Sequence, residues 1–131
     1  MVLCDVTLPG SLHGSLRSGS LSTTGPCVAS GDCITSFNYG NGNYANNEAC
    51  TITFGQSGTL TVDGFRTEPH SSCRYDQLTI GGTRYCGTTG PAGVGVGPST
   101  SATWGTDHSI TSSGWKICVT WGTVYIYMFY C

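Results

Sequence analysis

The chain has 131 residues and a formal net charge of −2 at pH 7. This length suits one domain, and the five scattered Lys and Arg residues form no basic stripe, which excludes nucleic acid as the partner. Charged residues make up 9 % of the sequence, against roughly 25 % in typical globular domains, so we expect a polar but weakly charged surface.

Residues 1–26 form the first predicted segment, an N-terminal arm or linker rich in Gly, Ser and Leu. The tripeptide Gly-Ser-Leu occurs at 10–12, 14–16 and 19–21. Composition favours a flexible linker. The repeated leucines also suit an edge strand on another subunit, and both interpretations stay open at this stage.

Residues 27–121 are predicted to form a β domain. Strict alternation of apolar and polar residues indicates strands at 50–54 and 59–62. The glycine-rich turn at 55–58 lies between them, so we expect these two strands to pair as a hairpin.

A second hairpin is predicted over residues 78–85, because the adjacent glycines 81 and 82 supply the positive φ angles that a tight turn needs. Further strands are expected at 102–104 and 115–119. No helical periodicity persists along the chain. Short strands with turn signals every eight to twelve or so residues predict an all-β fold, an antiparallel β-sandwich.

Residues 122–131 form an apolar C-terminal strand or tail, in which Val124–Tyr130 carries no charge. The segment is too short to span a bilayer as a helix, and as a free edge it would promote aggregation. We therefore expect it to be buried, paired or absent from the mature protein. Together with the N-terminal arm it could support β-strand exchange between identical subunits.

The eight cysteines indicate a disulfide framework and hence a secreted or cell-surface protein. Zinc binding is disfavoured because no Cys-x-x-Cys pair occurs. Residues 1–5 lack the basic and apolar pattern of a secretory leader, so no signal peptide is visible in this numbering.

Two of the seven acidic residues, Glu68 and Asp76, lie eight positions apart in one short loop, and Asp107 recurs in a similar turn context. Clustered carboxylates repel one another unless a cation joins them, so the pattern predicts an oxygen-ligated Ca²⁺ site. The alternative is that they are solvated loop acids that pair with Arg66 or Arg74.

Six short motifs follow one another along residues 27–121: Ser36–Gly40, Phe65 with Glu68, Cys73–Ile80, Cys86–Gly87, Trp104–Ser109 and Gly114–Trp115. In these motifs and their order, residues 27–121 resemble a CUB domain, an extracellular β-sandwich module. The resemblance implies a jelly-roll sandwich stapled by disulfides.

The resemblance also implies a calcium site at one end of the sandwich. Its direct ligands would be Glu68, Asp76 and Asp107, with Ser109 helping to complete the oxygen shell. Tyr44 would hold Glu68 by a hydrogen bond.

The disulfide pairing follows in part from the same resemblance. Two bridges match the family pattern, and a third joins cysteines outside it: Cys27–Cys50, Cys73–Cys86 and Cys33–Cys118. The third pair is expected because Cys33 adjoins an inward-facing isoleucine and so points outward to meet the last strand. Cys4 and Cys131 stay unassigned.

Two functional hypotheses follow. The first is a non-enzymatic, calcium-binding extracellular module that binds protein or glycan partners. The alternative is a structural subunit of an extracellular filament or matrix. An enzyme is disfavoured, because the consecutive residues Asp107, His108 and Ser109 point in different directions and cannot form a catalytic triad among themselves.

Overall fold

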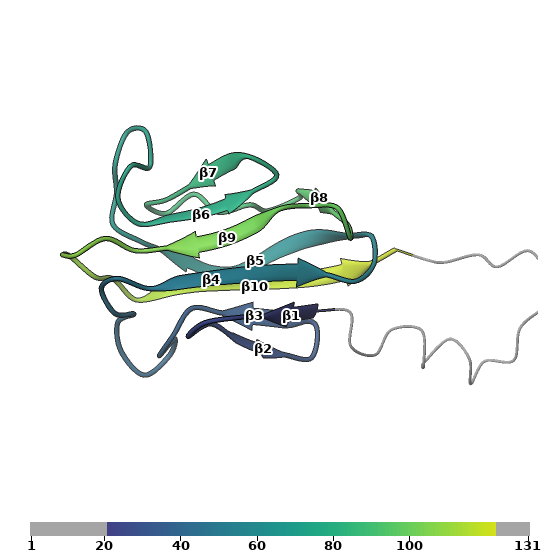
Figure 1. Ribbon diagram of the computed structural model, residues 1–131, viewed down its shortest axis with the longest axis horizontal. Coiled ribbons are helices and arrows are strands. Elements are labelled where there is room, and N and C mark those ends of the chain that lie inside the picture. Colours follow the sequence, from purple (N-terminus) through teal and green to yellow (C-terminus); the bar gives the residue numbers. More distant parts are fainter. Residues whose placement is uncertain (1–20, 123–131) are drawn as a thin grey trace, which may run out of the picture.

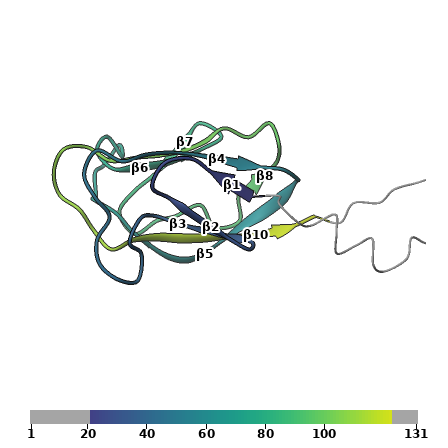
Figure 2. The same cartoon turned by 60° about the horizontal axis from the view of Figure 1, so that its bottom comes forward.

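The structure is a computed structural model that describes residues 21–122. In this part of the chain ten strands form two five-stranded sheets packed face to face, as Figures 1 and 2 show. Every strand pair is antiparallel. The predicted all-β antiparallel sandwich is confirmed.

Each sheet combines strands that are distant in sequence. The first sheet contains, in spatial order, β1 (Leu21–Thr23), β4 (Ala49–Phe54), β9 (Ala102–Gly105), β6 (Gln77–Ile80) and β7 (Thr83–Tyr85). The second contains β2 (Val28–Ser30), β3 (Cys33–Thr35), β10 (Gly114–Trp121), β5 (Gly58–Arg66) and β8 (Gly95–Val96).

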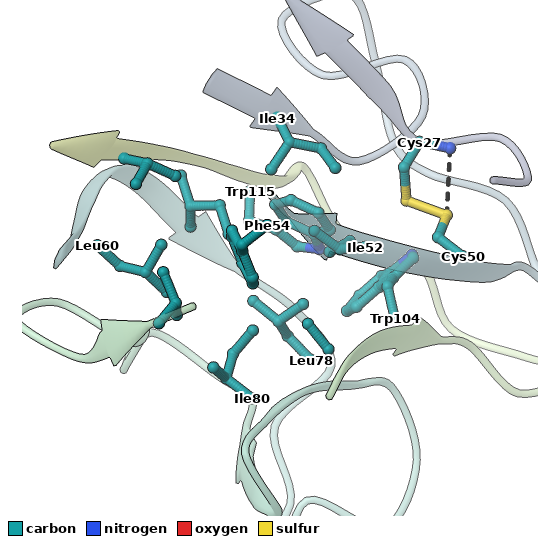
Figure 3. Close-up of a cluster of buried hydrophobic side chains, with 14 of the residues drawn as sticks. Cys27, Ile34, Cys50, Ile52, Phe54, Leu60, Leu78, Ile80, Trp104 and Trp115 are labelled. Carbon is teal, nitrogen blue, oxygen red and sulfur yellow. Dashed lines mark hydrogen bonds between the residues drawn. A yellow bond between two sulfur atoms is a disulfide. The ribbon is translucent and has the colours of Figure 1, made fainter. Parts of the chain in front are cut away.

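The core lies between the sheets, where alternate residues of facing strands meet (Figure 3). The buried hydrophobic side chains are Cys50, Ile52 and Phe54 on β4 and Trp115, Ile117 and Val119 on β10. The rings of Trp104 and Trp115 meet edge to face with centroids 5.6 Å apart. Burying each large apolar side chain contributes about 1.5–3 kcal/mol.

One predicted hairpin is confirmed and the other is wrong. Strands β6 and β7 pair around Gly81 and Gly82, which both have positive φ. Strands β4 and β5 do not pair, because they belong to opposite sheets. The turn at 55–58 reverses the chain, but turn chemistry alone does not select the strand against which the next one pairs.

The sandwich begins earlier than the predicted boundary at residue 27. Leu21–Thr23 forms β1 and pairs with β4 of the same chain, as the edge strand of the first sheet. The last leucine of the Gly-Ser-Leu repeat, Leu21, is thus half-buried within its own domain. Residues 1–20 and 123–131, with Cys4, Cys131 and most of both predicted tails, lie outside the described residues.

The two ends of the sandwich differ in what they carry. Three long loops, at 36–48, 67–76 and 106–113, gather at the left end in Figure 1. The start of β1 and the end of β10 lie at the opposite end (Figure 1). Within residues 21–122, no helix has the length and apolar character needed to cross a membrane.

Candidate metal centre

Three carboxylates from different parts of the chain meet at the loop end of the sandwich. Glu68 follows β5, Asp76 directly precedes β6, and Asp107 follows β9. One carboxylate oxygen from each lies within 4.8 Å of the others. The strands bring these side chains together, since β5, β6 and β9 all place a terminus at this end (Figure 1).

The cluster is largely removed from solvent. Glu68 is 6 % exposed and Asp76 is fully buried, whereas Asp107 is half-buried. Charged groups are rarely buried without a partner, because moving a charge out of water is costly. The arrangement therefore calls for a compensating positive charge or for bound protons.

Tyr44 links two of the three acids. Its hydroxyl donates a hydrogen bond to Asp76 Oδ2 over 2.5 Å and accepts one from the backbone N–H of Glu68 over 3.1 Å. The sequence analysis predicted that Tyr44 holds Glu68 by a hydrogen bond. In the structure the Tyr44 hydroxyl bonds the main chain of Glu68, and the carboxylate that it bonds is that of Asp76. The backbone N–H of Asp107 donates to Asp76 Oδ1 over 3.0 Å, so both oxygens of Asp76 accept hydrogen bonds.

Glu68 is less well satisfied. Its Oε2 is buried and has no hydrogen-bond partner among the described residues. Burial, and then the nearby charges of Asp107 and Asp76, raise the pKa of Glu68. An unpartnered buried carboxylate oxygen beside two further carboxylates is an arrangement that a cation would stabilise.

The same environment perturbs the other two groups of the cluster. Burial raises the pKa of Asp76, although the hydrogen bonds from Tyr44 and from the Asp107 backbone oppose that shift. Burial, and then the hydrogen bond to Asp76, raise the pKa of Tyr44. The hydroxyl of Tyr44 therefore stays protonated and remains a donor to Asp76.

Ser109 approaches this cluster through its backbone. Its N–H donates to Asp107 Oδ1 over 3.3 Å, and the backbone N–H of Asn47 donates to the carbonyl oxygen of Asp107 over 2.8 Å. These contacts fix the turn that carries Asp107. A ligand role for Ser109 remains a prediction.

Sequence reasoning missed a fourth acid, Glu48, which supports the site. Its carboxylate accepts hydrogen bonds from Trp104 Nε1 over 3.1 Å and from the Ala45 N–H over 3.2 Å. Its own N–H donates to Thr106 Oγ1 over 2.7 Å. Glu48 thus ties the loop of Tyr44 to the loop of Asp107. The sequence did contain a signal that could have identified Glu48, because it is an acidic residue just before a predicted strand in a chain with few charges.

The loop between Glu68 and Asp76 is closed on itself. His70 Nδ1 accepts hydrogen bonds from the backbone N–H groups of Ser72, over 3.1 Å, and Arg74, over 3.4 Å. A disulfide joins Cys73 to Cys86. Closing a loop of this size stabilises a fold by about 3 kcal/mol in the chain-entropy model, so this bridge restrains the segment that carries two of the three acids.

Two further disulfides lie in the described part of the chain. Cys27–Cys50 connects the segment after β1 to β4, and Cys33–Cys118 joins directly opposed residues of β3 and β10. All three bridges coincide with the pairs named from the sequence. They staple the sandwich at both sheets and at its loop end.

Comparison with known proteins gives three distant relatives, while no known family profile matches the chain. Blastula protease 10 of Paracentrotus lividus is 29 % identical over 135 aligned residues, which cover 86 % of this chain and 22 % of that protein. Protein SpAN of Strongylocentrotus purpuratus is 30 % identical over 135 aligned residues, which cover 86 % of this chain and 21 % of that protein. Human cubilin is 33 % identical over 104 aligned residues, which cover 69 % of this chain and 3 % of that protein.

All three relatives contain CUB domains. The chain is CUB-like. It spans about a fifth of the first two relatives and a small fraction of the third. The part of the first two that aligns is their non-catalytic CUB region, and all three proteins are extracellular. A disulfide-stapled sandwich agrees with such a module.

Proposed function

We propose that this chain is a non-enzymatic, secreted or cell-surface CUB module that binds Ca²⁺ and uses its calcium-ordered loops to receive a protein or glycan partner. The observation that carries the proposal is the largely buried triad of Glu68, Asp76 and Asp107, with one unpartnered oxygen on Glu68. The CUB-containing relatives support an extracellular interaction role.

The donor set fits calcium. All three groups offer carboxylate oxygen, the ligand type that hard cations prefer. Calcium binds oxygen at about 2.3–2.6 Å, so two oxygens on opposite sides of one ion lie about 5 Å apart. The separation of no more than 4.8 Å within the triad agrees with that span.

The surrounding residues have distinct roles in this proposal. Glu68, Asp76 and Asp107 would hold the ion, and Ser109 would add an oxygen from the turn. Tyr44 would orient Asp76 and the backbone of Glu68. Calcium would supply the positive charge that offsets repulsion between three carboxylates, and would thereby order the loops at 67–76 and 106–113.

Calorimetric titration of calcium into the chelator-stripped full chain tests the proposal. We expect one binding event per chain, which Asp107→Asn weakens by at least about tenfold because it removes a charged ligand. Asp63→Asn is the matched control, because Asp63 lies exposed on β5 and pairs with Lys116 instead. No calcium binding by the wild type, or equal binding by Asp107→Asn, contradicts the proposal.

A second candidate function is self-assembly into an extracellular filament or matrix by strand exchange through the terminal segments. The start of β1 and the end of β10 lie at the end of the sandwich opposite the acidic triad (Figure 1). Assembly through residues 1–20 and 123–131 would therefore leave the loop end accessible. Sedimentation of the full chain that shows only monomers at all concentrations rules this candidate out.

A further inference from the structure

A cleft lies beside the acidic triad, at the same end of the sandwich. It has a volume of about 350 Å³, and its walls are residues 66–69 at the end of β5 and just after it, residues 87–88 after β7 and residues 110–112 of the loop before β10. Its lining combines one arginine, several hydroxyls and two aliphatic side chains: Arg66, Thr88, Thr111, Pro69 and Ile110. A cleft of this size can hold one side chain with its adjoining peptide group.

The aliphatic wall is unusual in two respects. Ile110 is 63 % exposed, the largest exposed fraction among the exposed large apolar side chains of the described residues. Its φ is +60°, a left-handed conformation that β-branched residues rarely adopt. The surrounding loop holds it there, since Asn43 Nδ2 donates to Thr111 Oγ1 and the Tyr44 N–H donates to the Ser112 carbonyl. Strained residues of this kind cluster at binding sites.

Left-handed backbone conformations and exposed apolar side chains are both concentrated at this end. Within residues 21–122, the four non-glycine residues with positive φ all lie on its three loops: Asn38, Asn47, Cys73 and Ile110. Three of the four exposed large apolar residues lie on the same loops: Phe37, Tyr75 and Ile110. Large apolar side chains that stay exposed on loops, one of them the strained Ile110, are typical of a docking site rather than of a stabilising element.

Arg66 favours a negatively charged ligand in this cleft. It is exposed at the end of β5 and forms no ion pair within the described residues. A guanidinium group binds carboxylates with paired hydrogen bonds. Glu68 also lines the cleft, but it is 6 % exposed and offers an oxygen to the acidic triad. An anion is therefore favoured on the side of Arg66.

We propose that this cleft binds a peptide segment of a partner protein in which a carboxylate adjoins an aliphatic side chain. The carboxylate contacts Arg66, and the aliphatic group packs on Ile110 and Pro69. A peptide is favoured over an acidic sugar because no aromatic ring lines the cleft to stack on a sugar face. The proposal rests on the proposed interaction function, for which it names a partner chemistry.

Calcium should strengthen this binding. A divalent cation in the acidic triad cancels two of its three negative charges, which lowers the repulsion felt by a carboxylate in the neighbouring cleft. Linkage requires the reciprocal effect, so the carboxylate ligand strengthens calcium binding by the same factor. The walls of the cleft are already formed by residues that hydrogen bonds hold in place, so some binding persists without the metal.

The test uses N-acetyl-leucine as the probe, because it joins a carboxylate, a peptide-like amide and a branched alkyl group. It is titrated into the ¹⁵N-labelled full chain, in chelator and in calcium, and backbone amide shifts are recorded. We expect saturable shifts at 66–69, 87–88 and 110–112, with a dissociation constant of about millimolar order. N-acetyl-leucinamide and acetate should bind at least about fivefold more weakly.

Two variants with a matched control assign the contacts. Arg66→Gln should weaken the probe about fivefold, whereas Arg84→Gln on β7, outside the cleft lining, should leave binding unchanged. Ile110→Asn deletes the aliphatic wall but tolerates the left-handed conformation. It should therefore weaken the probe without lowering the melting temperature, which a purely structural role would not allow.

The outcomes separate this inference from the calcium proposal. If calcium binds but the probe does not, the peptide-binding proposal is contradicted and the calcium proposal stands. If the probe binds but calcium does not, the peptide-binding proposal is supported and the calcium proposal is contradicted. Equal shifts with N-acetyl-leucinamide, or tighter binding of the methyl glycoside of N-acetylneuraminic acid, also overturn the inference, because the recognised ligand would then be neutral or a sugar.

Discussion

Replacing Glu68 by glutamine should have opposite effects on stability with and without calcium. In chelator the substitution removes one negative charge from a largely buried cluster of three carboxylates. The new amide can donate hydrogen bonds to the neighbouring carboxylates. In calcium the same substitution removes a ligand. An ordinary surface acid would show neither effect.

The stabilisation in chelator can be scaled from the geometry. Two unit charges 4.8 Å apart repel by about 3.5 kcal/mol at an effective dielectric constant of about 20. Two factors reduce this gain: water screens the half-buried Asp107, and the raised pKa of Glu68 means that the wild type can relieve the repulsion by protonation at a lower free-energy cost than an ordinary carboxylate. We therefore expect a gain of about 1–2 kcal/mol, or about 4–8 °C in melting temperature.

The destabilisation in calcium follows from mass action. For a site with a dissociation constant of about 10⁻⁴ M, about 10 mM calcium stabilises the wild type by about 2.7 kcal/mol. A roughly hundredfold loss of affinity in the variant leaves only about 0.4 kcal/mol of that stabilisation. The calcium-dependent rise in melting temperature should thus shrink from about 11 °C to about 2 °C.

Thermal unfolding followed by circular dichroism, in chelator and in calcium near neutral pH, measures both effects. Asp63→Asn serves as the control, since its ion pair with Lys116 joins exposed side chains and contributes at most about 1 kcal/mol. The reasoning is refuted if Glu68→Gln lowers the melting temperature in chelator, or if calcium stabilises it as much as the wild type.

Three more predictions concern the same end of the molecule. The pKa values of Glu68 and Asp76 are raised in the folded state, so their contribution to the stability of the calcium-free protein should be greatest below about pH 4 and should fall as pH rises through the raised values. Melting curves across this pH range in chelator should show the loss of stability. Calcium should abolish that loss. Tyr44→Phe removes the hydroxyl that bonds Asp76 and should lower calcium affinity about tenfold, as calorimetry can measure; unchanged affinity contradicts the orienting role. Replacing both Cys73 and Cys86 by serine should lower the free energy of unfolding by about 3 kcal/mol and weaken calcium binding. Denaturant unfolding that shows no loss of stability would contradict the restraining role of this disulfide.

Local sequence patterns predicted the strands well. Alternation along Cys50–Phe54 and Trp115–Val119 identified β4 and β10, because a strand with one buried face repeats every two residues. The paired glycines 81 and 82 predicted the β6–β7 turn, since only glycine adopts successive positive φ angles readily. These features depend on neighbours in sequence, so sequence alone is sufficient for them.

Strand pairing was harder to predict. The turn at 55–58 resembles a hairpin turn, yet β5 crosses to the other sheet and pairs with β10 and β8. The three-residue β1 was assigned to a linker, because its burial depends on β4, which lies distant in the chain. Such choices are decided by which apolar faces can meet across the core.

The candidate site divides in the same way. Sequence alone determined that acids are scarce, that Glu68 and Asp76 share a short loop, and that a cysteine framework surrounds them. Only the tertiary structure decided that Tyr44 bonds Asp76, 32 residues away, and that the three carboxylates lie within 4.8 Å of one another. It also decided that Arg66 and Ile110 line one cleft beside that triad. Distances between loops are set by the packing of two sheets, and no local pattern encodes that packing.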